Sequence, residues 1–453
     1  MSNEQENNTT VETIVETRHA LSLQPALRFP EFQDSGAWEV KTLGEILVES
    51  RLGGNYENSD ANTGIPVIKM GNLDRGSINL QKVQFLPKDY EYQNDDILEI
   101  NDLLLNTRNT LELVGKVAIW KNELPTALYN SNLLRMTFHK DFIASNIFMN
   151  YCFNNQTTIS SIRNIATGTT SVAAIYTKDL LKLKVAIPSL PEQRKIADCL
   201  SSLDALITAE GEKLQALKAH KKGLMQNLFP AEGETVPRLR FPEFQDSGEW
   251  EVREVGDIYD FKVTNSFSRE NLNYVTGDVK NIHYGDIHTK FSTLFDISKE
   301  EVPYINLDVP INKIKAECYC VEGDIIFADA SEDLNDVGKS IEIVNLNNEK
   351  LVSGLHTLLA RQKEKRLIIG FGGYLFKSNP IRKQIQRKSQ GAKVLGISVG
   401  RISNVIISFP QNPAEQQKIA ACLSSLDALM TAQGEKIALL KQHKKGLMQV
   451  LFP

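Results

Sequence analysis

The chain has 453 residues, 42% of them hydrophobic and 24% charged, with a formal net charge of −5. A single hydrophobic core does not support this length, so we expect two or three domains of a soluble globular protein. The negative balance argues against binding of nucleic acid by the whole surface, but not against a local basic face. No apolar run approaches the roughly 18 residues of a membrane span, and the polar start lacks the pattern of a secretory signal, which together predict a cytoplasmic location.

The first segment of the chain, residues 1–24, is polar, and within it Val11–Ser22 could form a short helix. An opening segment follows at residues 25–46 and contains LRFPEFQDSGAWEVKTLGEI. It recurs from Leu239 as LRFPEFQDSGEWEVREVGDI, within residues 238–258. The chain therefore begins the same structural unit twice.

Each opening segment leads into a different insert, at residues 47–190 and 259–412. The inserts are mostly dissimilar, but both contain a short buried-strand pattern, NDLLL from Asn101 and GDIIF from Gly323. Both also close in an apolar strand before a proline, LKVAIP in the first and VIISFP in the second. Alternating short strands and helices with glycine turns predict one α/β (α+β) fold for both inserts.

A long helix is predicted after each insert, at residues 191–230 and 413–453. The two helices are identical at about three positions in four. The first is joined to the second opening segment by residues 231–237, AEGETVP, which have the composition of a linker.

Ser189 and Asn412 are predicted to cap the two helices, with Glu192 and Glu415 three residues later completing capping boxes. Apolar residues then recur at alternating steps of four and three, the spacing of a coiled-coil seam. The positions expected to pack one helix on the other are Ile196, Leu200, Leu203, Ile207, Leu214, Leu217, Leu224, Ile419, Leu423, Leu426, Met430, Ile437, Leu440 and Leu447.

The frame of the chain is thus repeated while the two inserts differ. A pseudo-twofold scaffold can hold two reading domains and offer equivalent surfaces to two identical partners. Catalysis alone gives no reason for such a design, so the repeat favours a recognition function.

Two variable domains, each preceded by an LRFPEF segment and closed by a helix ending in KKGLMQxLF, resemble the specificity subunit of type I restriction–modification enzymes. The resemblance covers nearly the whole chain, from about Pro25 to Pro453. Its repeat architecture is specific, whereas the residues inside the inserts are only weakly so. It implies that each insert is a target recognition domain that reads one half of a bipartite, asymmetric DNA sequence.

The resemblance further implies that the two long helices pair antiparallel as a spacer and dock two methyltransferase subunits, and that two motor–nuclease subunits complete the complex. S-adenosylmethionine would then belong to the methyltransferase partner and ATP and Mg²⁺ to the motor–nuclease partner, with no cofactor in this chain. A specificity subunit of a modification-only or type II-like system is a close variant kept as an alternative. A coiled-coil adaptor that binds only proteins is the alternative from a different class.

The segment Leu375–Arg401 is strongly basic and contains no acid. Charges at helical spacing predict a basic helix face against DNA phosphates, which argues against the adaptor. The cations expected there are Lys377, Arg382, Lys383, Arg387, Lys388 and Lys393. The matching region of the first insert contributes Arg163, Thr169 and Thr170, and matching Val-Gly-Lys turns contribute Lys116 and Lys339.

Base reading requires side chains with paired hydrogen-bond donors and acceptors. In the first insert such residues follow two predicted strands: Lys69, Asn72, Arg75, Asn106, Arg108 and Asn109. The equivalent places of the second insert carry His283, Tyr284, His288, Lys290 and Ser331. Each of these could equally be an ordinary exposed loop residue.

No catalytic motif accompanies these residues. The chain lacks any Pro-Pro pair, which the Pro-Pro-aromatic motif of the adenine methyltransferases requires. A segment that ends like a phosphate loop has Asp333 in place of its first glycine, and the five cysteines form no metal-ligand pattern. We therefore expect no metal site and no activity of the chain alone. The resemblance implies instead a required subunit of a site-specific adenine methyltransferase and type I endonuclease complex.

Overall fold

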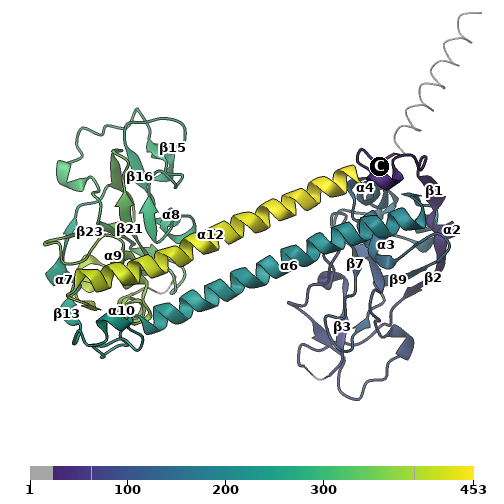
Figure 1. Cartoon of the computed structure of the whole chain (residues 1–453), viewed down its shortest axis with the longest axis horizontal. Helices are drawn as coiled ribbons and strands as arrows, with labels where there is room; N and C mark the ends of the chain where they lie inside the picture. Colours follow the sequence, from purple (N-terminus) through teal and green to yellow (C-terminus); the bar gives the residue numbers. More distant parts are fainter. Residues whose placement is uncertain (1–23, 63, 392) are drawn as a thin grey trace, which may run out of the picture. The chain divides into compact units, whose positions relative to one another are not determined.

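The structure is a computed structural model that describes residues 24–62, 64–391 and 393–453. The helix expected at Val11–Ser22 lies outside these residues. The chain forms two compact units, the first made of the described residues up to Gly211 with Lys436–Pro453, the second of Glu212–Glu435. Both boundaries fall inside the long helices α6 (Leu190–Asn227) and α12 (Pro413–Val450), shown in Figure 1. Each unit therefore holds one globular domain, the beginning of the helix that follows it and the end of the other helix.

The two opening segments fold alike. In the first unit the elements are η1 (Pro30–Phe32), β1 (Glu39–Thr42) and α2 (Leu43–Ile46). In the second they are η4 (Pro242–Phe244), β13 (Glu251–Glu254) and α7 (Val255–Ile258). Each strand pairs antiparallel with the last strand of its own domain, β1 with β12 (Lys184–Ile187) and β13 with β25 (Ile406–Phe409). The predicted closing strands are confirmed, and they tie the opening segment to the end of its domain.

The first domain is built on a four-stranded antiparallel sheet in the order β2-β9-β5-β7. Its strands are β2 (Leu47–Leu52), β9 (Leu133–Phe138), β5 (Leu103–Asn106) and β7 (Val117–Ile119). Two three-stranded sheets adjoin it: β4 (Gln84–Phe85), β3 (Pro66–Ile68) and β8 (Leu128–Tyr129), then β10 (Thr167–Gly168), β11 (Ala173–Ala174) and β6 (Arg108–Asn109). The shorter helices are η2 (Met70–Asn72), η3 (Asn94–Asp96), α3 (Asn146–Phe153), α4 (Gln156–Ile165) and α5 (Thr177–Leu180).

The second domain repeats this plan with a five-stranded sheet in the order β14-β23-β19-β21-β17. Its strands are β14 (Tyr259–Lys262), β23 (Thr357–Gln362), β19 (Ile325–Ala328), β21 (Ser340–Asn345) and β17 (Leu294–Asp296). The smaller sheets contain β15 (Leu272–Asn273), β18 (Tyr304–Ile305), β16 (Lys280–Ile282) and β22 (Leu351–Ser353), then β20 (Ala330–Ser331) and β24 (Leu395–Gly396). The helices are η5 (Arg269–Asn271), α8 (Tyr284–Thr289), η6 (Ala316–Cys318), α9 (Phe371–Lys377), α10 (Asn379–Lys388) and α11 (Val399–Ser403).

The predicted mixed fold is confirmed in both domains, as are the two internal strand patterns. NDLLL ends in β5 and GDIIF in β19, and every residue of both strands is buried. Most strand pairs are antiparallel, while β3–β8, β16–β22 and β17–β21 run parallel.

Each long helix ends before its final Leu-Phe-Pro, because those apolar side chains are buried elsewhere. Leu451 and Phe452 lie in the core of the first domain, where Phe452 packs edge-on against Trp38 with ring centroids 5.9 Å apart. Leu228 and Phe229 lie in the core of the second domain, Phe229 in the same way against Trp250. Each domain core is therefore completed by the end of the helix from the other repeat.

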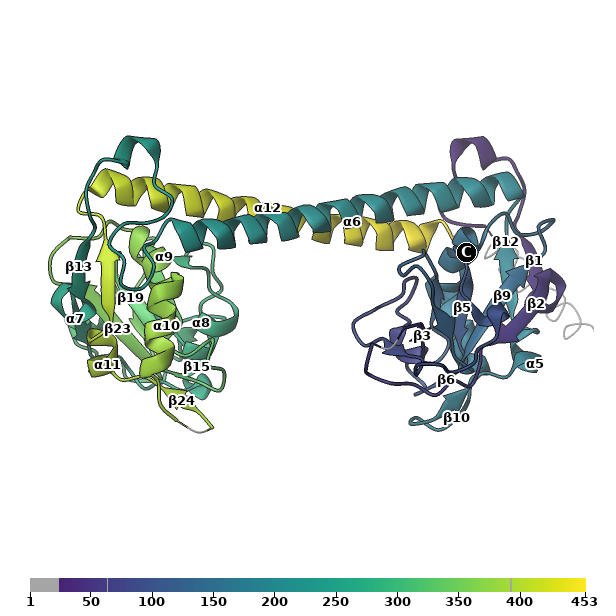
Figure 2. The same ribbon diagram turned by 90° about the horizontal axis from the view of Figure 1, so that it is seen from below.

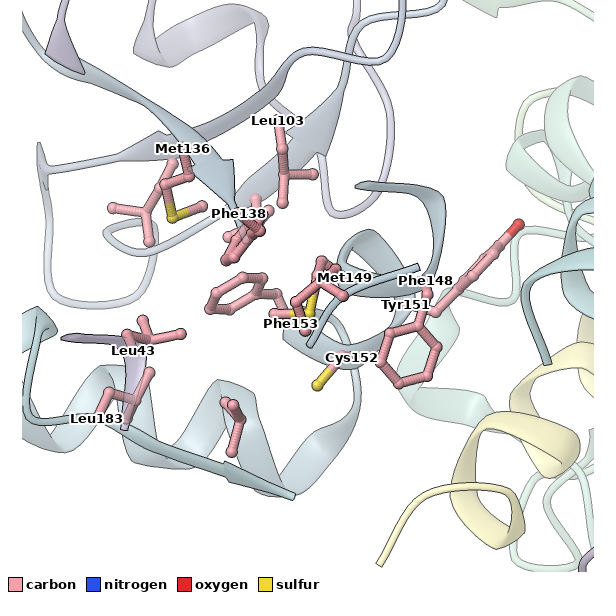
Figure 3. Close-up of a cluster of buried hydrophobic side chains, with 14 of the residues drawn as sticks. Leu43, Leu103, Met136, Phe138, Phe148, Met149, Tyr151, Cys152, Phe153 and Leu183 are labelled. Carbon is pink, nitrogen blue, oxygen red and sulfur yellow. The ribbon is translucent and has the colours of Figure 1, made fainter. Parts of the chain in front are cut away.

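The helix α3 fills the core of the first domain, as Figure 3 shows for Phe148, Met149, Cys152 and Phe153. The ring of Tyr151 packs at the edge of this cluster while its hydroxyl points away from it (Figure 3). Ile196 and Leu200 of α6 belong to the same core, and Ile419 and Leu423 of α12 to the core of the second domain. These four residues, predicted to pack one helix on the other, therefore contribute to the domain cores.

The predicted capping boxes are also not formed as expected, because the two glutamates bind arginines. Both carboxylate oxygens of Glu192 accept hydrogen bonds of 2.7 Å from Arg28. Glu415 accepts from Arg240 in the same bidentate way at 2.7 and 2.8 Å. Each buried acid thus ties an opening segment to the start of the helix of its own repeat. Asn412 does cap α12, through a 2.9 Å hydrogen bond from the amide of Ala414.

Two features are absent from the part of the chain that the structure describes. No helix there is long and apolar enough to cross a membrane. No group of three or more His, Cys, Asp or Glu side chains in residues 24–62, 64–391 and 393–453 is arranged to hold a metal ion.

Candidate nucleic-acid interface

A small hairpin beside a polar strand recurs in both domains. In the first domain β11 pairs with both β10 and β6, so Arg108 and Asn109 lie beside the hairpin that carries Thr169 and Thr170. In Figure 2 this hairpin, marked by β10, lies at the end of the domain away from α6. Arg108, Thr169 and Thr170 are exposed. The structure therefore brings together four of the residues that the sequence separates by about sixty positions.

The second domain has the same arrangement at β20 and β24. Ala330 and Ser331 pair with Gly396 and Leu395, and the hairpin tip carries the exposed Lys393. In Figure 2 β24 lies at the end of its domain away from α12. Both domains thus present a polar strand and a hairpin tip in one place, with different side chains.

Glycines allow a turn to pack closely under each hairpin. Gly115 and Gly338 adopt positive φ values of 74° and 64°, and a Cβ at either position would come within 2.5 Å of an isoleucine, Ile162 of α4 or Ile385 of α10. Lys116 and Lys339, which follow them, make local contacts. Lys339 donates to the carbonyl oxygen of His288 at 2.6 Å, and Lys116 lies 3.6 Å from Asp74. Both lysines therefore help to hold the turn after β3 or β16 in place.

Two of the predicted base-reading asparagines are buried and serve the fold. Asn72 accepts from the amide of Lys69 and donates to the carbonyl of Asn79, at 3.0 Å each. Asn106 donates to the carbonyl of Leu113 and accepts from the amide of Arg108. For both, the prediction of base contact is wrong, because their amide groups satisfy backbone groups of the loops. Lys69 is engaged as well, through a hydrogen bond to Gln84.

In the second domain the predicted residues around α8 form an aromatic cluster. Tyr284 packs against His283, His288 and His356, with ring centroids 4.6, 5.9 and 5.3 Å apart. His283 is buried and caps α8 by accepting from Gly285, and its burial lowers its pKa, as does the charge of Arg269. Nε2 of His288 lies 3.1 Å from the carbonyl oxygen of Ala330, and the ammonium of Lys290 lies 3.6 Å from the carboxylate of Asp286.

The basic face predicted on Leu375–Arg401 is divided in the structure. Arg382 donates to the backbone carbonyls of Asn335, Val337 and Gly338, the last at 2.7 Å. Lys377 donates a hydrogen bond of 2.8 Å to the hydroxyl of Thr293, and burial lowers the pKa of Lys377 to about 8. Arg387 pairs with Glu232. The prediction of one continuous phosphate face is therefore wrong, since these cations stabilise their own unit.

The remaining basic residues of that segment stay accessible. Lys383 and Lys393 are exposed and Lys388 is half-buried. Arg163 of the first domain is exposed as well. These four are the predicted phosphate contacts for which the structure leaves a cation at the surface.

The contact between Asp329 and His356 could not be predicted from the sequence. Asp329 directly follows β19, and its carboxylate lies 3.2 Å from Nδ1 of His356. His356 has a φ of 55°, which is unusual for a residue with a bulky side chain, and its carbonyl accepts from the amide of Asp329 at 3.0 Å. Both side chains are partly exposed, at 28% and 51%. The positive φ depends on tertiary contacts, so no signal in the sequence points to it.

The two helices touch each other within both units. In the first, Lys444 pairs with Asp204 and Lys436 with Glu210, and in the second Lys221 pairs with Asp427. The first two pairs run in opposite directions along the chain, so α6 and α12 are antiparallel there. Lys221 and Lys444 occupy equivalent positions in the two helices, and both form ion pairs between the helices. The other predicted seam residues are half-buried: Leu203, Ile207, Leu214, Leu217, Leu224, Leu426, Met430, Ile437, Leu440 and Leu447.

Comparison with known proteins gives relatives of one kind. A protein of Methanocaldococcus jannaschii, provisionally named type I restriction enzyme MjaX specificity subunit, is 24% identical over 423 residues that cover 92% of each chain. The type I restriction enzyme EcoKI specificity subunit of Escherichia coli is 23% identical over 186 residues, 41% of this chain and 40% of its own.

Solved structures show the same fold at lower identity. The crystal structure of a type I restriction–modification system S subunit from M. genitalium has a TM-score of 0.56 at 12% identity and covers 95% of this chain and 99% of its own. A chain from a structural study of complex assembly and conformational transition in the type I R-M system has a TM-score of 0.52 at 17% identity. The match covers 91% of this chain and 96% of that chain.

The repeated domains coincide with a described family domain. Residues 36–219 and 247–442 each match the type I restriction modification DNA specificity domain. Each match takes in a globular domain, its opening strand and most of the helix that follows. The chain therefore belongs to the type I restriction modification DNA specificity family, as a specificity subunit with two copies of the family's domain.

Proposed function

We propose that the two domains read the two halves of a bipartite, asymmetric DNA site within a type I restriction–modification complex. The observation that carries this proposal is that one frame, a polar strand beside a hairpin, displays different side chains in each domain. The first domain displays Arg108 and Thr169, the second Ser331 and Lys393. Different donors and acceptors at the same place of one fold read different bases. Membership of the DNA specificity family favours this function over the protein adaptor.

The proposed DNA contacts fall into two chemical classes, cations for phosphates and other polar side chains for bases. Accessible cations that are not used by the fold are the proposed phosphate contacts: Arg163, Lys383, Lys388 and Lys393. Polar side chains near the hairpins are the proposed base contacts: Arg108, Asn109, Thr169, Thr170, Ser331, Asp329 and His356. Phosphate contacts are expected to set affinity and base contacts to set sequence.

We infer that the paired helices fix the gap between the half-sites. A matched insertion of four residues after Leu214 and after Ile437 would lengthen each helix by about 6 Å. The recognised gap should then grow by one or two base pairs at about 3.4 Å each. The same four residues inserted after Gly233, in the exposed linker, should leave the gap unchanged. An unchanged gap in the helix variant, measured by mapping methylated sites, would reject the spacer role.

The helices also offer equivalent positions for two identical methyltransferase subunits. Leu206 and Leu429 are repeat equivalents and are 43% and 56% exposed. A single exposed leucine is ordinary, but the repeat places one at the same position of each helix, where two identical partners could bind equivalently. The variant L206E should lose one docked methyltransferase and the variant L206E/L429E both, which native mass spectrometry of the purified complex can count. Full occupancy in the double variant would place the docking surface elsewhere.

We further infer that the partners carry the chemistry: S-adenosylmethionine on the methyltransferase subunits, which act on adenine, and ATP and Mg²⁺ on two motor–nuclease subunits, in the cytoplasm. A modification-only system would contain the same recognition subunit without the nuclease. The two cases differ in ATP-dependent cleavage of unmethylated DNA by the assembled complex.

A further inference from the structure

A basic cleft in the first unit contains Arg75, which was predicted from the sequence as a base-reading residue, together with cations of α12. It has a volume of about 440 Å³ and lies between the first domain and the two long helices. The domain contributes Arg75 and Lys121, α6 contributes Asp204, and α12 contributes Lys441, Lys444 and Lys445. Five basic side chains thus face one acid in a chain whose net charge is negative.

The single acid does not neutralise the cleft. Asp204 already accepts hydrogen bonds from Tyr151 at 2.7 Å and from Lys444. In the described part of the chain, Lys121, Lys441 and Lys445 form no ion pair within 4.0 Å. Three ammonium groups are therefore left to attract an anion.

Arg75 is a second and independent feature that favours an anion at this cleft. Its Nη1 atom is buried and finds no hydrogen-bond partner among the described residues. Burial lowers the pKa of Arg75, and the neighbouring charge of Arg163 lowers it further. A guanidinium nitrogen without a partner is costly to bury, and an anion against the part of the half-buried Arg75 side chain that lines the cleft would offset part of this cost.

The equivalent cleft of the second unit differs in charge. It is lined by Lys299, Lys339 and Lys377 but also by the acids Asp296, Glu300 and Asp427. Repeat symmetry alone therefore does not produce the basic character, which belongs to the first unit.

We propose that this cleft binds backbone phosphates of double-stranded DNA next to the first half-site, with Arg75, Lys441 and Lys445 as the contacting cations. The proposal rests on the DNA-reading function proposed above. Lys441 and Lys445 are one helical turn apart, about 6 Å, which spans about two steps of one DNA strand at about 3.4 Å each along the axis. Cations spread over a domain and a helix fit an extended polyanion better than a single small anion.

The test compares two matched double variants in complex with the methyltransferase partner. K441Q/K445Q removes two charges from the cleft, and K218Q/K222Q removes the repeat-equivalent charges of α6, which do not line the second cleft. Glutamine preserves helix propensity, so both variants should fold as the wild type does. Affinity for a duplex that contains the recognised site is measured by fluorescence anisotropy over a range of salt concentrations.

The salt slope is the slope of the logarithm of affinity against the logarithm of salt concentration. K441Q/K445Q should reduce its magnitude by about 1.8, or about 0.9 for each phosphate that is no longer neutralised. The control K218Q/K222Q should reduce it by less than half as much. The ratio of wild-type affinity to K441Q/K445Q affinity should then fall about tenfold as the salt concentration rises from about 50 to about 200 mM. The variant K441R/K445R should restore the wild-type slope. Equal slopes for both glutamine variants would overturn the proposal, and so would loss of methyltransferase from the purified K441Q/K445Q complex, which would mark a protein-docking surface.

A second arm places neutral methylphosphonate linkages in the DNA next to the first half-site. They should weaken binding of the wild type but have little effect on K441Q/K445Q, and equal weakening of both would overturn the proposal. If the wild-type complex prefers its own site over scrambled DNA while the variants change nothing, the cleft proposal alone fails. If the wild type shows no such preference, the DNA-reading function fails first.

Discussion

The hydroxyl of Tyr374 donates a hydrogen bond of 2.7 Å to the carboxylate of Asp427, which also accepts from Lys221 of the other long helix. The ammonium of Lys221 lies 5.2 Å from the centre of the Tyr374 ring. Tyr151, Asp204 and Lys444 form the same triad in the first unit. In both units, one carboxylate thus joins a recognition domain to two helices that come from different repeats.

Replacement of this tyrosine should loosen the domain from the helices. Tyr374→Phe removes a hydrogen bond to a partly exposed carboxylate, so the free energy of unfolding should fall by about 1 kcal/mol. The matched control is Tyr259→Phe in the same unit, because the Tyr259 hydroxyl is buried with no hydrogen-bond partner among the described residues and its loss should be neutral. Urea unfolding measures both variants. Equal stability of the two variants would mean that the triad does not stabilise the unit.

The buried pair of Arg240 and Glu415 should be far more sensitive. Their side chains are 7% and 1% exposed, and Glu415 also accepts from the indole of Trp250 at 3.3 Å. Arg240→Met leaves a buried carboxylate without its cation, which should cost about 3–5 kcal/mol. Adding Glu415→Leu should recover part of this loss, because no unpaired charge remains. Simple additivity of the two effects in urea unfolding would contradict the coupling.

The Asp329 carboxylate should determine one base pair of the second half-site. Beside DNA, a carboxylate is repelled by phosphates but accepts hydrogen bonds from the amino groups of cytosine or adenine. Asp329→Ala should therefore relax specificity at one position, by about 1–3 kcal/mol, and leave the first half-site unchanged. Lys383→Ala, at a proposed phosphate contact, should weaken binding to all sites alike. A methylation motif that is unaltered in D329A would exclude Asp329 from base reading.

Stability of the second domain should depend on pH through Glu342. Burial raises the pKa of this carboxyl from its ordinary 4.5 to about 7, although the amides of Gly373 and Gly370 donate to it and oppose the shift. Because the folded state favours the protonated form, the stabilisation is complete below about pH 4.5 and is lost as the pH rises through about 7. Between about pH 5.5 and 8 the wild type should lose about 2 kcal/mol relative to Glu342→Gln. An equal pH dependence of the two proteins in urea unfolding would show that Glu342 is ionised throughout.

The strongest features of the fold could be predicted from the sequence because they are repeated and periodic. An apolar run before a proline at the end of each insert and two copies of a heptad pattern predict the positions of β12, β25, α6 and α12 within a few residues. The ends of the helices could not be predicted. Leu228 and Leu451 continue the heptad pattern but lie in domain cores, which the spacing of a single chain does not reveal.

The candidate site was harder to predict, because the same residue types serve the fold and the DNA. Asn72 and Arg382 have the donors that base or phosphate contacts require, but they satisfy backbone groups of their own domains. Only their tertiary partners separate the two roles. Arg108 and Thr169 come together through strand pairing, and Asp329 meets His356 through a residue with positive φ.

The measurement that tests the central claim most directly is a map of methylated sites in cells that express this chain with its methyltransferase partner. Long-read sequencing detects methylated adenines across the genome. Two reading domains on a fixed spacer predict one motif made of two different short halves separated by a gap of constant length. A single continuous motif, or two halves with a variable gap, would contradict the account.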